Sequence, residues 1–126
     1  MHPDKIKNIF NLSAEDRYGY LVKRAADFEE LWLIQENDSY VTLVDDDGNI
    51  SIPVWPEKEF AELFLKDDWK SFVVERLEVY DFIEWLDQLN EDNIKIAAFP
   101  KEDMKGIVVT ANDMKNHLLF ELQQYE

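Results

Sequence analysis

Apolar residues recur at helical spacing in three parts of the chain. Positions i, i+4, i+7, i+8 and i+11 predict a first amphipathic helix, with the stripe Ala14, Tyr18, Leu21, Val22 and Ala25. Ser13 precedes this stripe as the expected N-cap residue. A second helix over residues 78–90 has an apolar arc made of Val79, Phe82, Ile83, Leu86 and Leu89. The last helix opens at Thr110, and its stripe is Met114, Leu118, Leu122 and Tyr125.

Between the first two helices the apolar spacing changes to two, which is typical of strands. It predicts strands at residues 31–35, 40–44 and 50–55. A short helix follows from Pro56, because a helix tolerates proline at its first position. Further short strands are expected at residues 71–76, 94–99 and 106–109.

The Asp-Gly pair at residues 47–48 predicts a hairpin between the second and third strands, because glycine adopts positive φ without steric cost. A two-residue loop at Asp47-Gly48 would place Pro53 where the ladder needs an N–H. A loop at Gly48-Asn49 would turn the missing donor outward. A three-residue loop with a glycine bulge is the third alternative. We expect the third strand to be an edge strand, which Pro53 protects from pairing with other chains.

Together these elements predict an α+β fold in a single domain over residues 1–126, in the order α-βββ-α-β-α-ββ-α. The sheet should be mostly antiparallel, with a three-stranded meander plus further strands packed against about four helices. Residues 1–11 are expected to form a short leading helix or a loosely attached arm.

The chain is strongly acidic, with 28 Asp and Glu against 13 Lys and Arg and a formal net charge of −15. Such a surface repels nucleic-acid phosphates and anionic lipid, so we expect neither nucleic-acid nor membrane binding. No apolar run approaches the roughly 20 residues that span a bilayer, and the N-terminus lacks the apolar core of a signal peptide. These features predict a cytoplasmic protein.

The motifs that catalysis or cofactor binding would need are missing from the sequence. The chain has no cysteine, only three glycines and two histidines, so familiar zinc sites and phosphate-binding glycine loops are not expected. An EF-hand around Gly48 would need carboxylates at Leu43 and Val54, and both residues are apolar. We therefore predict no enzyme activity, no metal and no cofactor. A carboxylate-based enzyme remains an alternative, because some of the 28 acids will lie close together.

Several local motifs, taken in order along the chain, resemble those of a known family. They are Leu12-Ser13-Ala14-Glu15-Asp16-Arg17-Tyr18-Gly19-Tyr20, Asp45-Asp46-Asp47-Gly48-Asn49, Pro53-Val54-Trp55-Pro56, Phe60-Ala61-Glu62, Ala98-Phe99-Pro100 and Gly106-Ile107-Val108-Val109. The chain resembles, over nearly its whole length, the short acidic bacterial proteins grouped as domain of unknown function 2750. The resemblance implies a bacterial cytoplasmic setting, and it transfers no catalytic residue because the family has no assigned activity.

Two features indicate where a partner protein would bind. The predicted helix at residues 78–90 carries acids opposite its apolar arc, and no Lys or Arg lies between residues 79 and 93. Trp55 is expected to pack in the core, with an exposed aromatic anchor as the alternative. The candidate partner-binding residues are Trp55, Glu78, Asp81, Glu84, Trp85 and Asp87.

The function that these features favour is a small acidic protein-binding module that docks a basic protein partner. It would act as an immunity-type protein that covers a basic toxin or nuclease, or as an adaptor or regulator. We expect it to be a monomer or a weak homodimer. The alternatives are a small-ligand-binding protein and the carboxylate-based enzyme.

Overall fold

The computed structural model describes residues 2–104 and 106–124, and these residues form five α-helices and seven strands. The helices are α1 (Pro3–Phe10), α2 (Ala14–Phe28), α3 (Lys58–Glu62), α4 (Val79–Glu91) and α5 (Ala111–Gln123), with a 3-10 turn at Asp67–Trp69. The strands are β1 (Glu30–Glu36), β2 (Ser39–Tyr40), β3 (Leu43–Val44), β4 (Ile50–Val54), β5 (Val73–Glu78), β6 (Lys95–Ala98) and β7 (Ile107–Val109). The α+β class is confirmed, and the leading segment is the helix α1.

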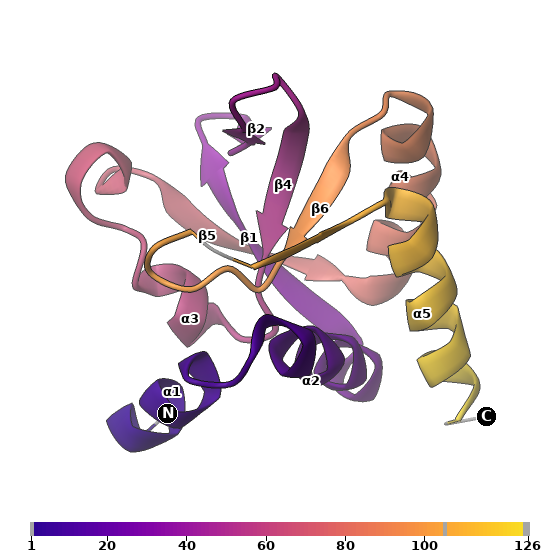
Figure 1. Cartoon of the computed structure of the whole chain (residues 1–126), viewed down its shortest axis with the longest axis horizontal. Coiled ribbons are helices and arrows are strands. Elements are labelled where there is room, and N and C mark those ends of the chain that lie inside the picture. The colour runs from indigo at the N-terminus through magenta and orange to yellow at the C-terminus, as the bar shows by residue number, and fades with distance from the viewer. Residues whose placement is uncertain (1, 105, 125–126) are drawn as a thin grey trace.

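The strands belong to two sheets, with the orders β2-β1-β5 and β3-β4-β6-β7. The strand pairs are antiparallel except β4 and β6, which run parallel. The two sheets meet at an isolated bridge between Trp32 of β1 and Trp55, where the two backbone N–H···O distances are 2.8 and 2.9 Å. In Figure 1 the strands fan out above α1 and α2, with α4 and α5 on one side and α3 on the other.

The predicted meander is therefore divided between the two sheets. The predicted strand 40–44 contains β2, which pairs with β1, and β3, which pairs with β4. Between them the N–H of Val41 still donates to Ile34 O of β1, at 2.9 Å. The period-two pattern correctly predicted extended backbone for this segment. The pattern does not indicate which neighbouring strand pairs with each part of the segment.

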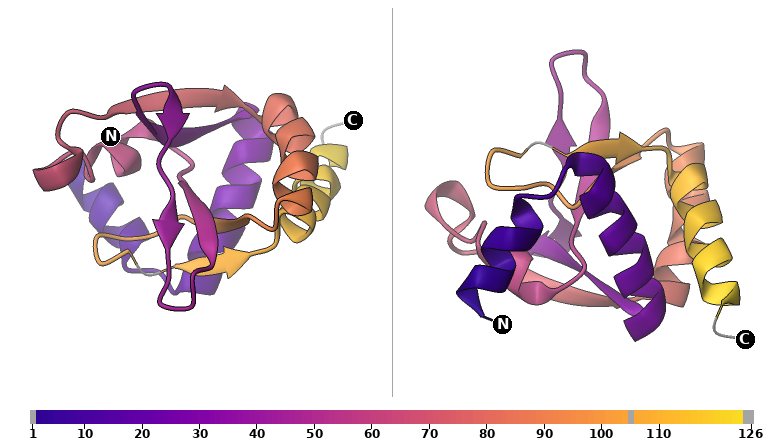
Figure 2. Two further views of the ribbon diagram at one scale, coloured as in Figure 1. Left: turned by 90° about the horizontal axis from the view of Figure 1, so that it is seen from above. Right: turned by 60° about the horizontal axis from the view of Figure 1, so that its bottom comes forward.

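The β3–β4 hairpin follows the third alternative, a three-residue loop. Leu43 pairs with Ser51 and Val44 with Ile50, and the N–H of Asp45 donates to Asn49 O at 3.1 Å, which leaves residues 46–48 as the loop. Gly48 has φ +84°, the left-handed conformation that a glycine bulge requires. The tip of this hairpin extends beyond the rest of its sheet (Figure 2, right).

Strand β4 is not an edge strand, because β3 and β6 flank it, so that prediction was wrong. Val54 O accepts the N–H of Phe99 on the β6 side at 2.9 Å, while Trp55 bonds to β1 on the opposite side. Since successive residues point their N–H groups to opposite sides, the missing donor of Pro53 faces away from β6. On that side β3 reaches only as far as the pair Leu43–Ser51, so Pro53 has no partner in β3 and removes no ladder bond.

The helices follow their predicted stripes and caps. Ser13 Oγ accepts the N–H of Asp16, and Thr110 Oγ1 accepts that of Asp113, both at 3.1 Å. The whole predicted arc of α4 is buried, as are Met114, Leu118 and Leu122 of α5, whereas Tyr125 lies outside the described residues. These stripes join the buried strand residues in a hydrophobic core. Within the part of the chain that the structure describes, none of the helices combines the length and apolarity needed to cross a membrane.

Candidate functional site

The outer side of α4 carries a row of carboxylates, which we call the acidic face. It consists of Glu78, the N-cap residue of α4, and of Asp81, Glu84, Asp87 and Glu91 within the helix, all of them exposed. The face is exposed because the opposite arc of the helix is buried in the core. Acids near the amino-terminal end of α4 interact favourably with the helix dipole, whereas Glu91 lies at the carboxyl-terminal end, where an acid is unfavourable.

One member of the acidic face has a cationic partner from the neighbouring helix. Lys115 Nζ of α5 lies 2.8 Å from Asp87 Oδ1. The Asp87 carboxylate is exposed to solvent and Lys115 is half-buried, so the pair contributes about 1 kcal/mol or less to stability. Sequence analysis missed this cation because it lies on another helix, 28 residues along the chain. Among the described residues, Glu84 and Glu91 have no ion-pair partner.

Trp85 lies at the margin of the acidic face and is half-buried. Its ring packs on Tyr40 of β2, with centroids 5.3 Å apart, and on Phe82 within α4, at 6.4 Å. These contacts fix the indole against the first sheet while part of it remains accessible. Trp85 therefore stays a candidate for partner binding.

Trp55 must be removed from the candidate docking residues, because its side chain is completely buried, with 0% exposure. The indole Nε1–H donates to Pro100 O at 3.0 Å, and the ring packs on Phe64 with centroids 5.0 Å apart. The core-packing interpretation is the one that the structure supports. The position is buried because β1 and the segment after β6 both converge on it.

The Asp45 carboxylate is used to hold the hairpin turn together. Its Oδ1 accepts the backbone N–H groups of Asp47 and Asn49, at 2.9 and 2.8 Å, and its Oδ2 accepts the Asn49 side-chain amide at 2.9 Å. These bonds, that of the Asn49 side chain first, hold the pKa of Asp45 below its usual value. In the described part of the chain, no three Asp, Glu or His side chains gather in a way that could hold a metal ion.

A buried ion pair that sequence analysis missed joins α2 to the corner between β4 and α3. Glu57 has a side chain only 6% exposed, and its Oε1 lies 2.9 Å from Arg24 Nε. Tyr20 donates its hydroxyl to Glu57 Oε2 at 3.2 Å. Burial, and then the Glu57 charge, raise the pKa of Tyr20 to about 12. Because the neighbours of Glu57 are a guanidinium and a phenol, the cluster is organised as a structural tie between elements and does not form a carboxylate pair of the glycosidase type.

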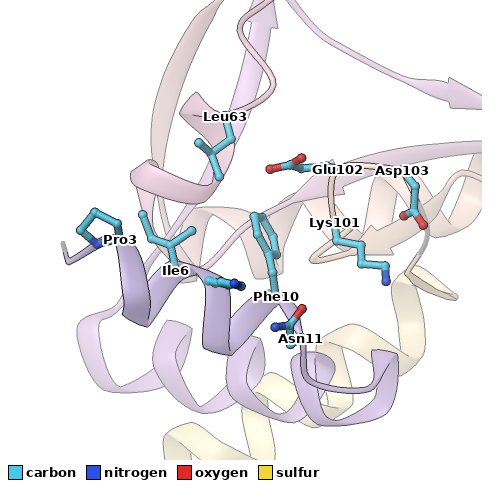
Figure 3. A pocket seen from close by; sticks show the side chains of 9 residues that line it. Pro3, Ile6, Phe10, Asn11, Leu63, Lys101, Glu102 and Asp103 are labelled. Carbon is cyan, nitrogen blue, oxygen red and sulfur yellow. The ribbon is translucent and has the colours of Figure 1, made fainter.

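A groove of about 630 Å³ lies between α1, the end of α3 and the segment that follows β6. Ile6 and Phe10 of α1 face Leu63 across it (Figure 3). The other residues that line it are Pro3, Lys7, Asn11, Lys101, Glu102 and Asp103. An apolar floor with charged groups at the rim can bind an amphipathic molecule.

Comparison with protein-family models adds one finding. The model of DUF2750, described as a protein of unknown function, matches residues 18–118. The chain belongs to this family. Searches of curated proteins and of solved structures found no match.

The DUF2750 match confirms the resemblance seen in the sequence and adds no activity to it. Both the acidic face and the Glu57 cluster lie within the matched residues. The wall of the groove formed by α1 lies outside them. The DUF2750 description therefore leaves the roles of the acidic face and of the groove to be inferred from their chemistry.

Proposed function

We propose that this DUF2750 protein is a binding module that docks a basic segment of a partner protein on the acidic face of α4. The observation that carries the proposal is the row of exposed carboxylates on one helix, of which Asp87 has a cationic partner. Trp85 at the margin supplies an aromatic contact, the residue type that is enriched at the centre of interfaces.

The energetics of the helix support this use of the surface. Like charges three or four residues apart on a helix each cost roughly 0.2–0.5 kcal/mol. Asp81, Glu84, Asp87 and Glu91 are spaced in this way, and Glu91 also opposes the helix dipole. A face needed only for solubility can mix both signs of charge without this cost. Docking a basic partner converts the repulsion into attraction and accelerates association.

Two cellular roles fit such a module in the bacterial cytoplasm. One is an immunity-type protein that covers a basic toxin or nuclease, and the other is an adaptor or regulator of a cellular partner. A neighbouring gene that encodes a secreted toxin would favour the first role.

The test uses a charge reversal that leaves the ion pair of Asp87 intact. Glu84→Lys with Glu91→Lys should preserve the fold, because both side chains are exposed and a lysine at position 91 suits the helix dipole. The matched control is Asp46→Lys with Asp47→Lys, which changes the net charge equally at the exposed hairpin turn. Wild type and both variants are first used to isolate partners from the native cell. Association rates with the isolated partner are then measured over a range of salt concentrations.

The expected result is slower association and a weaker salt dependence for the α4 variant only. Exposed charges separated by more than about 8–10 Å are screened at physiological ionic strength, so rates for the wild type should fall steeply as salt rises. The proposal is wrong if the α4 variant associates at the wild-type rate, or if the hairpin control slows association equally.

A further inference from the structure

We propose that the groove beside α1 binds a small amphipathic anion, with its apolar part on Ile6, Phe10 and Leu63 and its anionic group near Lys7 and Lys101. This inference does not rest on the proposed partner-binding function, because the groove and the acidic face are formed by different elements. Its volume of about 630 Å³ falls within the range of about 300–1,000 Å³ that is usual for small-molecule sites.

The floor of the groove is apolar and firmly supported. Phe10 is only 8% exposed and packs edge-on against Phe60, with ring centroids 5.0 Å apart, and against Phe99 at 5.7 Å. Ile6 and Leu63 are half-buried and turn their remaining surface to the groove (Figure 3). A ligand chain or ring placed between them would remove this apolar surface from water without displacing the core.

The sign of the ligand charge follows from the cations at the rim. In a chain with 13 bases and 28 acids, Lys7 and Lys101 both line this one groove. Of the two acids at the rim, Asp103 already interacts with the buried guanidinium of Arg17. Burial lowers the pKa of Arg17, and the negative charge of Asp103 opposes that lowering. This leaves two lysines against Glu102, which is exposed.

Two groups oppose an anion, and they determine how the experiment is designed. Glu102 carries a negative charge, and the carboxyl-terminal end of α1 presents carbonyl groups near Asn11. The charge preference is therefore measured directly, with three probes that share one ten-carbon chain: decanoate, decylammonium and decanol. Binding is followed by the NMR shifts of the Ile6 and Leu63 methyl groups, with each probe kept below its micelle concentration.

Decanoate should shift these methyl signals in a saturable way and should bind more tightly than decanol and decylammonium. Replacing both rim lysines, as Lys7→Ala with Lys101→Ala, should weaken decanoate binding by about tenfold. The matched control is Lys23→Ala with Lys70→Ala, which removes two exposed lysines outside the groove and should leave the affinity unchanged. Leu63→Gln keeps the charges and makes the floor polar, so it should weaken all three probes.

Several outcomes would overturn the inference. They are no saturable shift up to about 1 mM decanoate, binding of decylammonium as tight as that of decanoate, or equal losses in the groove variant and its lysine control. Unchanged decanoate binding in Leu63→Gln would equally exclude the apolar floor as the binding surface. None of these results bears on the acidic face, so the two proposals succeed or fail separately.

Discussion

Replacing Trp55 with phenylalanine tests the packing of the largest fully buried side chain among the described residues. The change removes the indole N–H that donates to Pro100 O at 3.0 Å, and it leaves that buried carbonyl without its donor. An unsatisfied buried polar group costs about 1–3 kcal/mol, and the smaller ring adds a cavity beside Phe64. We expect a total loss of about 2–4 kcal/mol, a large part of the 5–15 kcal/mol that is usual for the stability of a domain.

The matched control is Trp69→Phe. Trp69 is half-buried in the 3-10 turn, where the centroid of its ring lies 6.0 Å from that of Phe72. The substitution should therefore lower the free energy of unfolding by about 1 kcal/mol or less. Unfolding in urea is followed by far-ultraviolet circular dichroism, because tryptophan fluorescence changes with the substitution itself. The midpoint of Trp55→Phe should fall by about 1–2 M, since m is about 1–3 kcal/mol/M for small proteins. If both variants shift equally, the stabilisation assigned to the indole hydrogen bond is wrong.

Three further outcomes are expected. Gly106→Ala should destabilise the protein, because the added Cβ would lie 3.0 Å from Ala98 O. Gly19→Ala in α2 has open space around the added Cβ and should stabilise by about 0.5–1 kcal/mol. Thermal unfolding of the two variants measures this contrast, and equal shifts of the two midpoints would contradict it. Because the pKa of Asp45 is lowered from 3.8, the stability it contributes is present above that pH and is lost as pH falls through the folded-state pKa. The difference in urea midpoint between wild type and Asp45→Ala should thus shrink below pH 3.8, and a constant difference would exclude this linkage. A chelator should leave the thermal midpoint unchanged, and a drop of many degrees would show that folding needs a metal.

The elements that could be predicted from the sequence are those whose signal is local. The stripes of α2, α4 and α5 repeat every three or four residues, and the capping side chains of Ser13 and Thr110 bond only three residues ahead. The hairpin at Gly48 is equally local. In each case the residues that decide whether the element forms are neighbours along the chain, although the sequence left three loop alternatives open for the hairpin.

What could not be predicted depends on partners that are distant in sequence. The division of the 40–44 segment between two sheets depends on whether β1 or β4 accepts its hydrogen bonds. Likewise, Lys115 reaches the acidic face from another helix. The sequence contains one indication that Glu57 is buried, which is its position between the apolar pairs Trp55-Pro56 and Phe60-Ala61. Its partner Arg24 lies on α2, however, and the sequence does not connect the two.

The bridge between Trp32 and Trp55 makes the two sheets a single cooperative unit. Each tryptophan donates its backbone N–H to the carbonyl of the other, at 2.8 and 2.9 Å, at the point where the sheets meet. Opening either sheet alone would leave two N–H and two C=O groups without partners beside the fully buried indole of Trp55. We therefore expect the amide hydrogens of both residues to exchange with solvent through global unfolding, and those of frayed helix ends to exchange through small local openings.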